Sequence, residues 1–567
     1  MKLAGLIALL LLSAIYCKSK EEWKSRSIYQ LLTDRFARSS DTGYCNYSQY
    51  CGGNYRGLIN KLDYIKGMGF DAIWISPIIE NTEGSYHGYH FTNLYNLNYH
   101  FGSEDDFKEL IKTCHSKDIW VMVDVVANHA GPVGTDFGRI NPFNRAEHYH
   151  DWCEINNWHN QWEVENCRLC GLPDLKQEND WVTQKLLEWI HDLVQKYNLD
   201  GIRIDTIMEV PKWFWDKFRT SAGVFQIGEA FNGDPGYVAD YQNHLDSVFN
   251  YPLYYTIKSS FCGSFRNLEG YLFNTRKVFP APEYTATFVE NHDNPRWLNE
   301  CGDRAKFTNA VIFSLVWEGI PVFYYAGEQY YAGGADPNNR EPLWDNYNTK
   351  STLYQLLGKT HALRKKVQIW NYGIVQRYAD DNFYAFTRGN VLAFFTNVQS
   401  SQYKITYHDF KEGDKLCNAL YDRDCVTVSG GAIKYVWYRV IYKFYIILTS
   451  AGDIDNGLSQ LDDIKKAIIN FKSQLKMKAI LVLLFLAFAY SLPNPVYMIK
   501  DCFEKLYDVK SNDVLQWSVT NELLNWKVDE FYAKVNNVYP TLKQKIEECA
   551  EQTSKKYQRQ RIRVSQN

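Results

Sequence analysis

The sequence lacks a marked excess of charge of either sign, and neither of its two pronounced apolar runs is long enough to span a membrane. Its 62 Lys and Arg residues nearly balance 65 Asp and Glu residues, which leaves a net charge of −3. Such a chain has no overall basic surface for holding nucleic acid. The apolar runs at 3–15 and 479–486 are shorter than the ~20 residues that cross a bilayer. We therefore expect no nucleic-acid partner and no stable membrane anchor.

The first apolar run has the anatomy of a secretory signal. Lys2 precedes it, and small or polar residues follow through Lys18, so residues 1–17 are expected to be a signal peptide. The mature protein is then secreted, or lies in an extracellular, vacuolar or lysosomal space. In an oxidising compartment nearby cysteines are disulfide candidates rather than metal ligands. Asn46 begins a glycosylation sequon, Asn46-Tyr47-Ser48.

Local spacing predicts which of the 13 cysteines pair. The favoured pairs are Cys45–Cys51 and Cys153–Cys167, and weaker candidates are Cys417–Cys425 and Cys502–Cys549. Cys17 is expected to leave with the signal peptide. The sequence offers no partner for Cys114, Cys170, Cys262 or Cys301.

Apolar runs typical of buried strands recur between residues 27 and 330, with helix-like segments such as Glu104–Ser116 and Val182–Tyr197 between them. The eight runs are Ser27–Leu31, Asp71–Ser76, Ile119–Val125, Gly201–Asp205, Val224–Gly228, Asp246–Phe249, Thr285–Val289 and Pro321–Tyr325. Continuously apolar strands that alternate with helices indicate a parallel sheet. Eight such units predict an α/β fold, a (β/α)8 TIM barrel.

The barrel is expected to occupy residues 18–378, with an inserted subdomain at 130–180, after the third strand. That stretch is rich in Trp, His, Asn and Cys and has little periodicity. Shorter alternating runs, such as Phe383–Thr387, Val391–Thr396 and Lys404–His408, predict a C-terminal antiparallel β domain at 379–450. Residues 451–476 are a linker or a helix.

The last part of the chain contains a second signal-like segment at 477–489. Met477-Lys478 precedes an apolar run that ends in Ala487-Phe488-Ala489, a cleavage pattern. A fusion of two genes or an internally processed precursor explains it, and a buried helix is the alternative. Residues 490–567 are expected to be a small helical segment of unknown role with a basic, solvated end.

Polar side chains follow four of the predicted barrel strands. The third ends in Asp124–His129, the fourth in Arg203 and Asp205, the fifth in Glu229, and the seventh is followed by Glu290–Arg296. Taken singly, such an acid is more often a helix cap, and such a histidine is usually structural. A barrel, however, brings all of these ends to one mouth. Crowded acids cannot all stay ionised, which supplies one acid and one nucleophile.

Alternation along Gly201–Asp205 places Arg203 and Asp205 on the same face of the strand, so the arginine is expected to keep the carboxylate ionised. Aromatic residues make up 16% of the chain. They fit a large core, or flat surfaces that stack on sugar rings. Composition favours the core.

Residues 27 to about 445 resemble the α-amylase family of glycoside hydrolases, in particular its secreted, calcium-containing fungal members. The motifs that carry the resemblance are Thr33–Ala37, Cys51–Gly53, Lys61–Ile65, Tyr86–Tyr89, Asp124–His129, Gly201–Thr206, Gly228-Glu229, Phe288–Arg296, Tyr325–Gln329 and Tyr331–Glu341. The resemblance implies that Asp205 is the nucleophile, Glu229 the general acid/base and Asp293 the stabiliser of the transition state. The substrate-binding residues that it implies are Tyr89, His129, Arg203, His292, Asp336 and Arg340.

The resemblance also implies a structural calcium ion. Its ligands would come from Asn128, Glu165, Asp174 and the backbone carbonyl of Glu209, which tie the insertion to the barrel. Oxygen ligands of this kind suit calcium. The sequence departs from the fungal pattern at Met208-Glu209, where the relatives carry Lys-His, and at His90, where they often carry Trp. The first departure removes a cation from a leaving-group-side subsite, and the second removes a stacking platform.

The implied function is that of a monomeric, retaining, endo-acting α-amylase, which hydrolyses internal α-1,4-glucosidic bonds of an α-glucan, starch or glycogen. A maltogenic hydrolase or an α-glucan transferase with the same catalytic machinery is the nearest alternative. Non-catalytic carbohydrate-binding relatives characteristically lack the catalytic carboxylates, all three of which this chain has.

Overall fold

The computed structural model describes residues 18–448 except 41–42, 399–401, 422–424 and 437–444. All of these lie in the first of two units of the chain, Met1–Ala451. The predicted signal peptide, the segments at 451–476, 477–489 and 490–567, and the pair Cys502–Cys549 lie outside the described residues. Within the described ranges, no helix combines the length and apolar character that a membrane crossing requires.

Eight parallel strands form the central sheet, one for each run that the sequence predicts. They are β1 (Ile28–Leu31), β2 (Ala72–Ile75), β5 (Trp120–Val125), β6 (Gly201–Ile204), β7 (Phe225–Gly228), β8 (Ser247–Val248), β9 (Ala286–Thr287) and β10 (Ile320–Tyr324). Their order is β8-β7-β6-β5-β2-β1-β10-β9. A parallel bridge between Phe249 and Ala286 joins the two outer strands. The sheet therefore closes on itself, and the predicted (β/α)8 barrel is confirmed.

Alternate residues of each barrel strand belong to two different cores. Ile202 and Ile204 pack in the large cluster between the sheet and its helices. Trp74, Met122 and Ile227 belong to a second cluster inside the barrel. Because side chains alternate along a strand, the inward row of each strand continues to its carboxyl end. This alternation decides which residues reach the barrel mouth.

An aromatic residue near the start of the described chain fills the inside of the barrel. Trp23, at the end of α2 (Lys20–Trp23), is fully buried and stacks on Phe225 with ring centroids 5.1 Å apart. A Cβ atom at Gly201 would lie 2.8 Å from the Trp23 ring. Strand β6 therefore begins with glycine because the indole occupies the space of a side chain.

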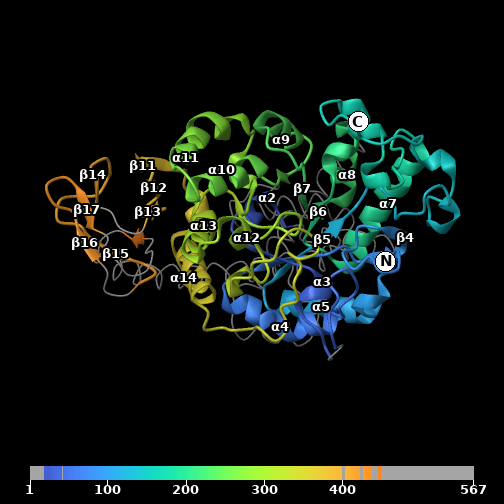
Figure 1. Cartoon of the computed structure of the whole chain (residues 1–567), viewed down its shortest axis with the longest axis horizontal. Coiled ribbons are helices and arrows are strands. Elements are labelled where there is room, and N and C mark those ends of the chain that lie inside the picture. The colour runs from blue at the N-terminus through green and yellow to red at the C-terminus, as the bar shows by residue number, and fades with distance from the viewer. Residues whose placement is uncertain (1–17, 41–42, 399–401, 422–424, 437–444, 449–567) are drawn as a thin grey trace, which may run out of the picture. The chain divides into compact units, whose positions relative to one another are not determined.

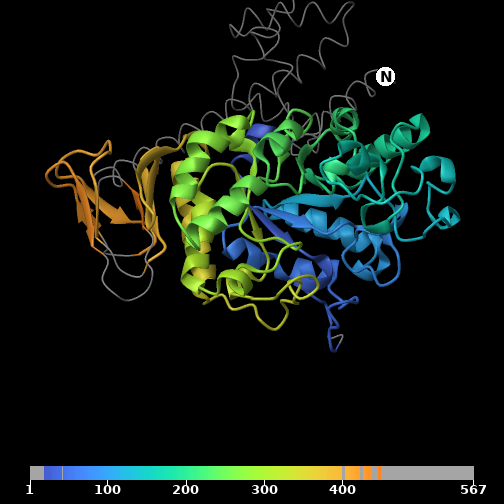
Figure 2. The same cartoon turned by 45° about the horizontal axis from the view of Figure 1, so that its top comes forward.

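Helices surround the barrel, as Figures 1 and 2 show. Those between successive strands include α4 (Tyr55–Gly67), α5 (Glu104–Ser116), α7 (Asp180–Tyr197), α8 (Lys212–Ala222), α10 (Tyr251–Phe261) and α13 (Arg304–Val316), and α14 (Thr352–Val367) follows the last strand. Helix α5 has the predicted bounds, because Ser103 and Asp106 form a capping box at its start. Helix α7 starts two residues before its predicted first residue, behind the Asn179 cap.

The long connection between β5 and α7 consists of short pieces. Among them are α6 (Gln161–Asn166) and η4 (Leu169–Gly171), and the disulfide Cys153–Cys167 closes the stretch. Isolated bridges join His129 to Asp174 and Tyr149 to Leu175. The end of this connection is thereby held against the first residues after β5.

Antiparallel strands follow α14. A six-stranded sheet has the order β11-β12-β13-β18-β15-β16, and β14 (Gln402–Ile405) pairs with β17 (Ile433–Val436). The sheet contains β11 (Val375–Ala379), β12 (Phe383–Arg388), β13 (Val391–Thr396), β15 (Lys415–Asn418), β16 (Cys425–Thr427) and β18 (Tyr445–Leu448). The predicted strand Lys404–His408 is wrong at its end: β14 stops at Ile405, which pairs with Ile433, the first residue of its antiparallel partner β17.

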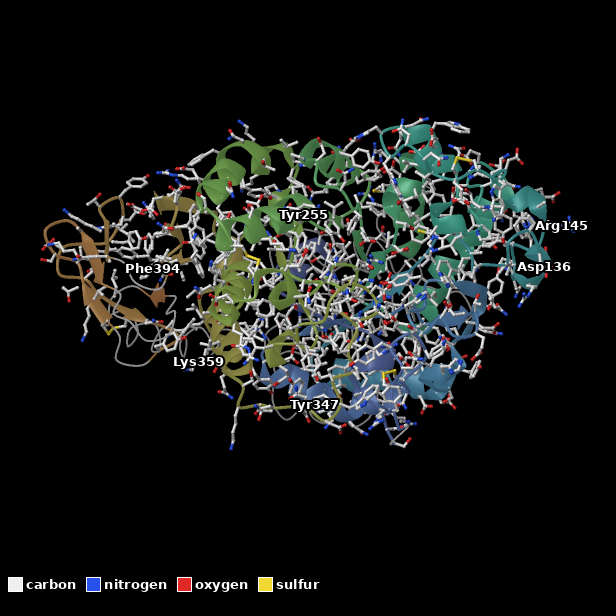
Figure 3. All side chains as sticks on the ribbon, in the orientation of Figure 1. Asp136, Arg145, Tyr255, Tyr347, Lys359 and Phe394 are labelled. Atoms are coloured by element: carbon white, nitrogen blue, oxygen red, sulfur yellow. A yellow bond between two sulfur atoms is a disulfide. The ribbon has the colours of Figure 1, made fainter. Side chains whose placement is uncertain are left out.

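Strand β12 joins the C-terminal sheet to the barrel helices. Its residues Tyr384 and Phe386 belong to the large barrel cluster, whereas Phe383 and Ala385 face a second, smaller core. The Phe386 ring lies 5.9 Å from the Phe313 ring of α13. Lys359 of α14 donates to the carbonyl of Leu420 at 2.9 Å, and both Lys359 and Phe394 are labelled in Figure 3. Both faces of β12 are therefore buried.

The disulfides confirm three predicted pairs and add one. Cys45–Cys51, Cys153–Cys167 and Cys417–Cys425 are bonded. The fourth disulfide, Cys262–Cys301, joins two cysteines for which the sequence offered no partner. Among the described cysteines, Cys114 is buried and free, and Cys170 is exposed and free.

Candidate active site

The buried guanidinium of Arg203 is the centre of the site. It lies on β6, and its Nη1 atom is 2.7 Å from Asp205 Oδ1 and 3.0 Å from Asp124 Oδ1. Its Nη2 atom is 2.5 Å from Glu229 Oε2. Asp124, Asp205 and Glu229 occupy inward-facing positions at the carboxyl ends of β5, β6 and β7. The alternation of side chains along these strands therefore brings all three carboxylates to one guanidinium. The predicted contact between Arg203 and Asp205 is confirmed.

The second carboxylate, Glu229, is buried and has its own donor. Tyr251 donates to Glu229 Oε1 at 2.9 Å, and Asn291 donates to the Tyr251 hydroxyl at 2.9 Å. Burial raises the pKa of Glu229 above its usual range, against the opposing effect of Arg203. The negative charges of Asp293 and Asp205 raise it further. The carboxyl is therefore held toward its protonated form, as a general acid requires.

Asp293 is more open than Asp205 and Glu229, with 32% of its side chain exposed. It follows β9, and Arg340 Nη2 lies 3.4 Å from its Oδ1 atom. Arg340 also donates from Nε to the carbonyl of His292 at 3.0 Å, and its Nη1 atom lies 3.2 Å from Asp336. Arg340 thus connects Asp293 with Asp336, the pair that the resemblance assigns to neighbouring sugar positions.

A hydrogen-bonded row of side chains reaches the arginine from the other side. Gln30 Nε2 is 2.7 Å from His292 Nδ1, and His292 Nε2 is 2.8 Å from the Tyr89 hydroxyl. That hydroxyl donates to Asp124 Oδ2 at 2.8 Å. Burial lowers the pKa of His292, so the imidazole is neutral. With Nδ1 accepting from the Gln30 amide, Nε2 carries the proton and donates to Tyr89.

Tyr89 and the two histidines form a close group. The Tyr89 and His292 rings are stacked, with centroids 5.5 Å apart and planes 5° apart. His129 Nε2 lies 3.1 Å from the carbonyl oxygen of Tyr89. Of the predicted substrate-binding residues, Tyr89, His292 and Arg340 are thus brought together, with His129 beside them and Asp336 at the more exposed edge.

The side chains of Asn128 and Asp174 and the backbone carbonyl of Glu209 converge next to this group, where the resemblance implies calcium. One end of the Asn128 carboxamide lies 3.0 Å from Asp174 Oδ1 and 3.1 Å from the carbonyl oxygen of Glu209. If that end is nitrogen, it donates to both oxygens. If it is oxygen, it completes an oxygen cluster for a hard cation. Asn128 and Asp174 are buried, so these residues fit the predicted ion.

The fourth predicted ligand, Glu165, is linked to that cluster through Gln161. Glu165 accepts a hydrogen bond from Gln161 at 2.8 Å, and Gln161 also donates to the carbonyl of Met208 at 3.1 Å. Helix α6 is thereby attached to the segment that precedes α8. In the described part of the chain, no three His, Cys, Asp or Glu side chains form a metal-binding group, so an ion here depends on amide and backbone oxygens.

Sequence reasoning assigned no role to several residues of the site. Asp124 contacts Arg203, but the sequence indicated Asp124 only as part of the polar segment that ends the third strand. Gln30 lies on the inward row of β1, and Tyr251 and Asn291 follow β8 and β9. Phe231 and Tyr255 are 44% and 41% exposed, and their rings flank Tyr251 at 4.7 and 6.2 Å. Figure 3 labels Tyr255. These two rings form an aromatic shelf beside Glu229.

The fold and the site together define a class of protein. Active sites of (β/α)8 barrels lie at the carboxyl ends of the strands. Paired carboxyl groups there, one of them held toward its protonated form, are the catalytic equipment of glycoside hydrolases.

Comparison with known proteins identifies the family within that class. The family model described as "Alpha amylase, catalytic domain" matches residues 30–400, and the chain belongs to this family. An α-amylase of Saccharomycopsis fibuligera is 39% identical over 442 residues, which are 73% of this chain and 89% of the relative. α-Amylase 2 of Schwanniomyces occidentalis is 37% identical and covers 72% of this chain and 89% of its own length. The solved α-amylase of Malbranchea cinnamomea superposes with a TM-score of 0.73 at 37% identity, and covers 76% of this chain and 97% of its own.

Proposed function

We propose that this protein is an endo-acting, retaining α-amylase that hydrolyses internal α-1,4-glucosidic bonds of starch or glycogen. The observation that carries the proposal is that one guanidinium contacts both Asp205 (2.7 Å) and Glu229 (2.5 Å). Carboxylates held by neighbouring nitrogens of one arginine favour the short separation, ~5–5.5 Å, of retaining enzymes over the wider gap that admits a water molecule.

The proposed chemistry has two steps. Asp205, held by Arg203 at 2.7 Å, attacks the anomeric carbon and forms the glycosyl-enzyme, while Glu229 gives its proton to the departing glycosidic oxygen. Glu229 then takes a proton from water, which attacks the anomeric carbon and releases Asp205. Asp293 faces the developing positive charge on the sugar and grips its hydroxyl groups, and Arg340 holds Asp293 in place.

The other proposed residues position the substrate. Tyr89 stacks on the central sugar, and His129 and His292 hydrogen-bond its hydroxyl groups. Asp336 and Arg340 line the next sugar position on the non-reducing side. Asn128, Asp174, Glu165 and the Glu209 carbonyl would hold a calcium ion, which when bound supplies structural cross-linking rather than catalysis.

The proposal also covers the secretion and the domain organisation of the mature protein. We propose a secreted monomer with cleaved residues 1–17, a catalytic barrel at 18–378, an insertion at 130–180 and a β domain at 379–450. Four disulfides support an oxidising compartment. The polar sequon at Asn46 is the proposed glycosylation site.

Two variants test the catalytic assignment. Glu229→Gln and Asp205→Asn are expected to fold and to lose nearly all starch hydrolysis, by about 10²–10⁴-fold for loss of the acid. Asp105→Asn, on the exposed start of α5, is the matched control and is expected to keep full activity. Substantial activity in either catalytic variant contradicts the assignment.

Product analysis tests endo action. On soluble starch, an endo-acting enzyme lowers iodine staining early, because each internal cut shortens a long helix-forming chain. Short products that accumulate without a fall in staining would instead indicate a maltogenic enzyme, and lengthened or cyclic products would indicate a transferase.

A further inference from the structure

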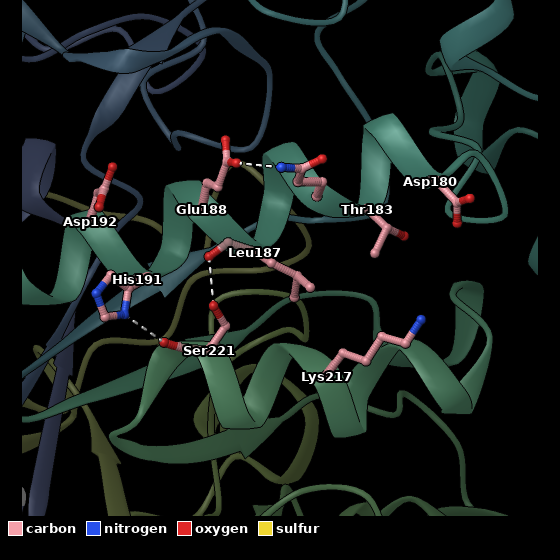
Figure 4. Close-up of a pocket in the computed structure, with 9 residues that line it drawn as sticks. Asp180, Thr183, Leu187, Glu188, His191, Asp192, Lys217 and Ser221 are labelled. Atoms are coloured by element: carbon pink, nitrogen blue, oxygen red, sulfur yellow. Dashed lines mark hydrogen bonds between the residues drawn. The ribbon is translucent and has the colours of Figure 1, made fainter.

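A groove of about 500 Å³ lies between α7 and α8 on the outside of the barrel (Figure 4). Its volume falls in the range of small-ligand sites, ~300–1,000 Å³. The lining residues that matter here are Asp180, Thr183, Gln184, Glu188, Lys217 and Ser221. None of them belongs to the catalytic site described above.

Hydrogen bonds join the two helices at one end of the groove. Ser221 donates to the carbonyl of Leu187 at 2.7 Å, and His191 Nδ1 lies 3.2 Å from the Ser221 carbonyl oxygen. These bonds hold the two helices together at that end. Toward the other end, Figure 4 shows the Lys217 side chain extending toward the amino-terminal half of α7, near Thr183 and Asp180.

The lining suits a neutral ligand that carries hydroxyl groups. Lys217 supplies hydrogen-bond donors, and Asp180 supplies acceptors. The Glu188 carboxylate is already engaged, because it accepts from Gln184 at 2.8 Å and lies 2.6 Å from Lys185 Nζ. The carboxylates disfavour a phosphate or another anion, whereas a sugar presents donors and acceptors around its whole ring.

An exposed tryptophan continues the groove along α8. Trp213 is 39% exposed, and the Lys217 ammonium lies 4.7 Å from the centroid of its ring. Trp213, Lys217 and Ser221 are spaced by four residues, so they lie along one face of the helix. A flat aromatic ring next to a polar groove offers one surface for stacking and another for hydrogen bonds.

The chain connects this groove to the segments that meet beside the active site. Helix α8 begins three residues after Glu209, and α7 begins six residues after Asp174. Glu209 and Asp174 are the residues that meet at Asn128. Both helices therefore begin shortly after residues that meet at Asn128, and their first turns lie on the side of the barrel where the strands end and the active site opens.

We propose that the α7–α8 groove and Trp213 form a second, non-catalytic binding site for an α-glucan chain. The site holds a polymer whose other segment occupies the active site, and so raises the local concentration of cleavable bonds. The identity of the ligand rests on the proposed function, whereas the existence of a hydroxyl-binding groove rests on its lining.

Two substrates of different length test the proposal. Trp213→Ala and Lys217→Ala are each expected to lower kcat/KM on amylopectin by about 3- to 10-fold, through a raised KM. Maltopentaose is expected to engage the active site alone, so its hydrolysis is expected to stay unchanged. Trp162→Ala, at a residue 63% exposed on α6, is the matched control and is expected to change neither substrate.

The outcomes separate the two proposals. Unchanged amylopectin kinetics in both variants, or equal losses on both substrates, overturn the groove proposal. Failure of the unmodified enzyme to hydrolyse maltopentaose and amylopectin overturns the proposed function instead. A second readout uses Asp205→Asn with its active site saturated by maltopentaose: retardation in an amylopectin gel is expected, and its persistence after Trp213→Ala and Lys217→Ala are added contradicts the groove.

Discussion

At the scale of single residues, the site depends on a few contacts that the strand pattern cannot specify. Alternation along β6 predicts that Arg203 and Asp205 share a face, and the barrel topology predicts that Glu229 joins them. Tyr251 could not be assigned in the same way, because it reaches Glu229 only through the close approach of β7 and β8. The sequence therefore predicts the contacts among the proposed reacting groups better than the contacts of the residues that adjust their pKa.

Tyr251 offers a test of how Glu229 is adjusted. Its hydrogen bond favours the ionised form of Glu229 and so lowers the pKa of that carboxyl. In the proposed mechanism Glu229 must be protonated to act as the acid, so activity is expected to fall as the pH rises through its pKa. Tyr251→Phe removes the donor, so the alkaline limb of kcat/KM is expected to move up by about 0.5–1 pH unit.

The matched control is Tyr255→Phe, which removes a hydroxyl from the neighbouring ring of the shelf. Its pH profile is expected to coincide with that of the unmodified enzyme. An alkaline limb of Tyr251→Phe that stays in place or moves to lower pH contradicts the role given to this hydrogen bond.

Asp174 tests the proposed ion. Calcium that binds only the folded protein raises Tm as its concentration rises. Asp174→Asn removes a charged oxygen ligand, so its Tm is expected to become independent of calcium, in differential scanning fluorimetry with calcium or with chelator. Glu178→Gln is the matched control, since Glu178 shares His150 with Asp174 (2.9 and 2.7 Å) without being a proposed ligand. A calcium-dependent Tm in Asp174→Asn refutes the assignment.

At the scale of elements, local patterns predict the existence of strands and helices, while their ends depend on partners. All eight barrel strands are predicted, yet β9 is shorter than the predicted Thr285–Val289. Beyond it, the Asn291 side chain accepts from the backbone N–H groups of Asp293 and Asn294. Such local bonds compete with a strand ladder. The Cys262–Cys301 disulfide was missed because it links segments 39 residues apart that only the fold brings together.

The contact between α13 and β12 is a second structural feature that the sequence does not predict. Arg388 donates to the carbonyls of Val316 (3.2 Å) and Trp317 at the end of α13, and to Tyr372 at 3.0 Å. A cation there also complements the helix dipole. Arg388→Met leaves these buried acceptors unpaired, and is expected to lower the free energy of unfolding by about 1–3 kcal/mol.

Thermal or urea unfolding measures that loss. Arg388→Lys keeps the charge with fewer fixed donors, so it is expected to fall between the Met variant and the unmodified protein. Specific activity at low temperature should change little, because Arg388 lies outside the catalytic site. Equal stability of the Met variant and the unmodified protein contradicts the proposed junction.

At the scale of the whole molecule, the family match and the described structure both lie within the first 450 or so residues. The second signal-like segment, at 477–489, lies beyond them. A processing site there predicts that the secreted enzyme ends before Met477. Intact mass spectrometry of the secreted protein, after removal of N-glycans, checks this. A single chain that contains residues 490–567 contradicts it.

The shared arginine has a consequence for any attempt to re-engineer the enzyme. Asp205 and Glu229 have opposite proposed tasks, yet both contact the same guanidinium, which Asp124 contacts as well. A substitution that strengthens or weakens one of these ion pairs changes how the positive charge is shared among the others. The three ion pairs are therefore coupled, and adjusting one carboxylate independently requires changes at neighbours such as Tyr251, which contacts Glu229 and not Arg203.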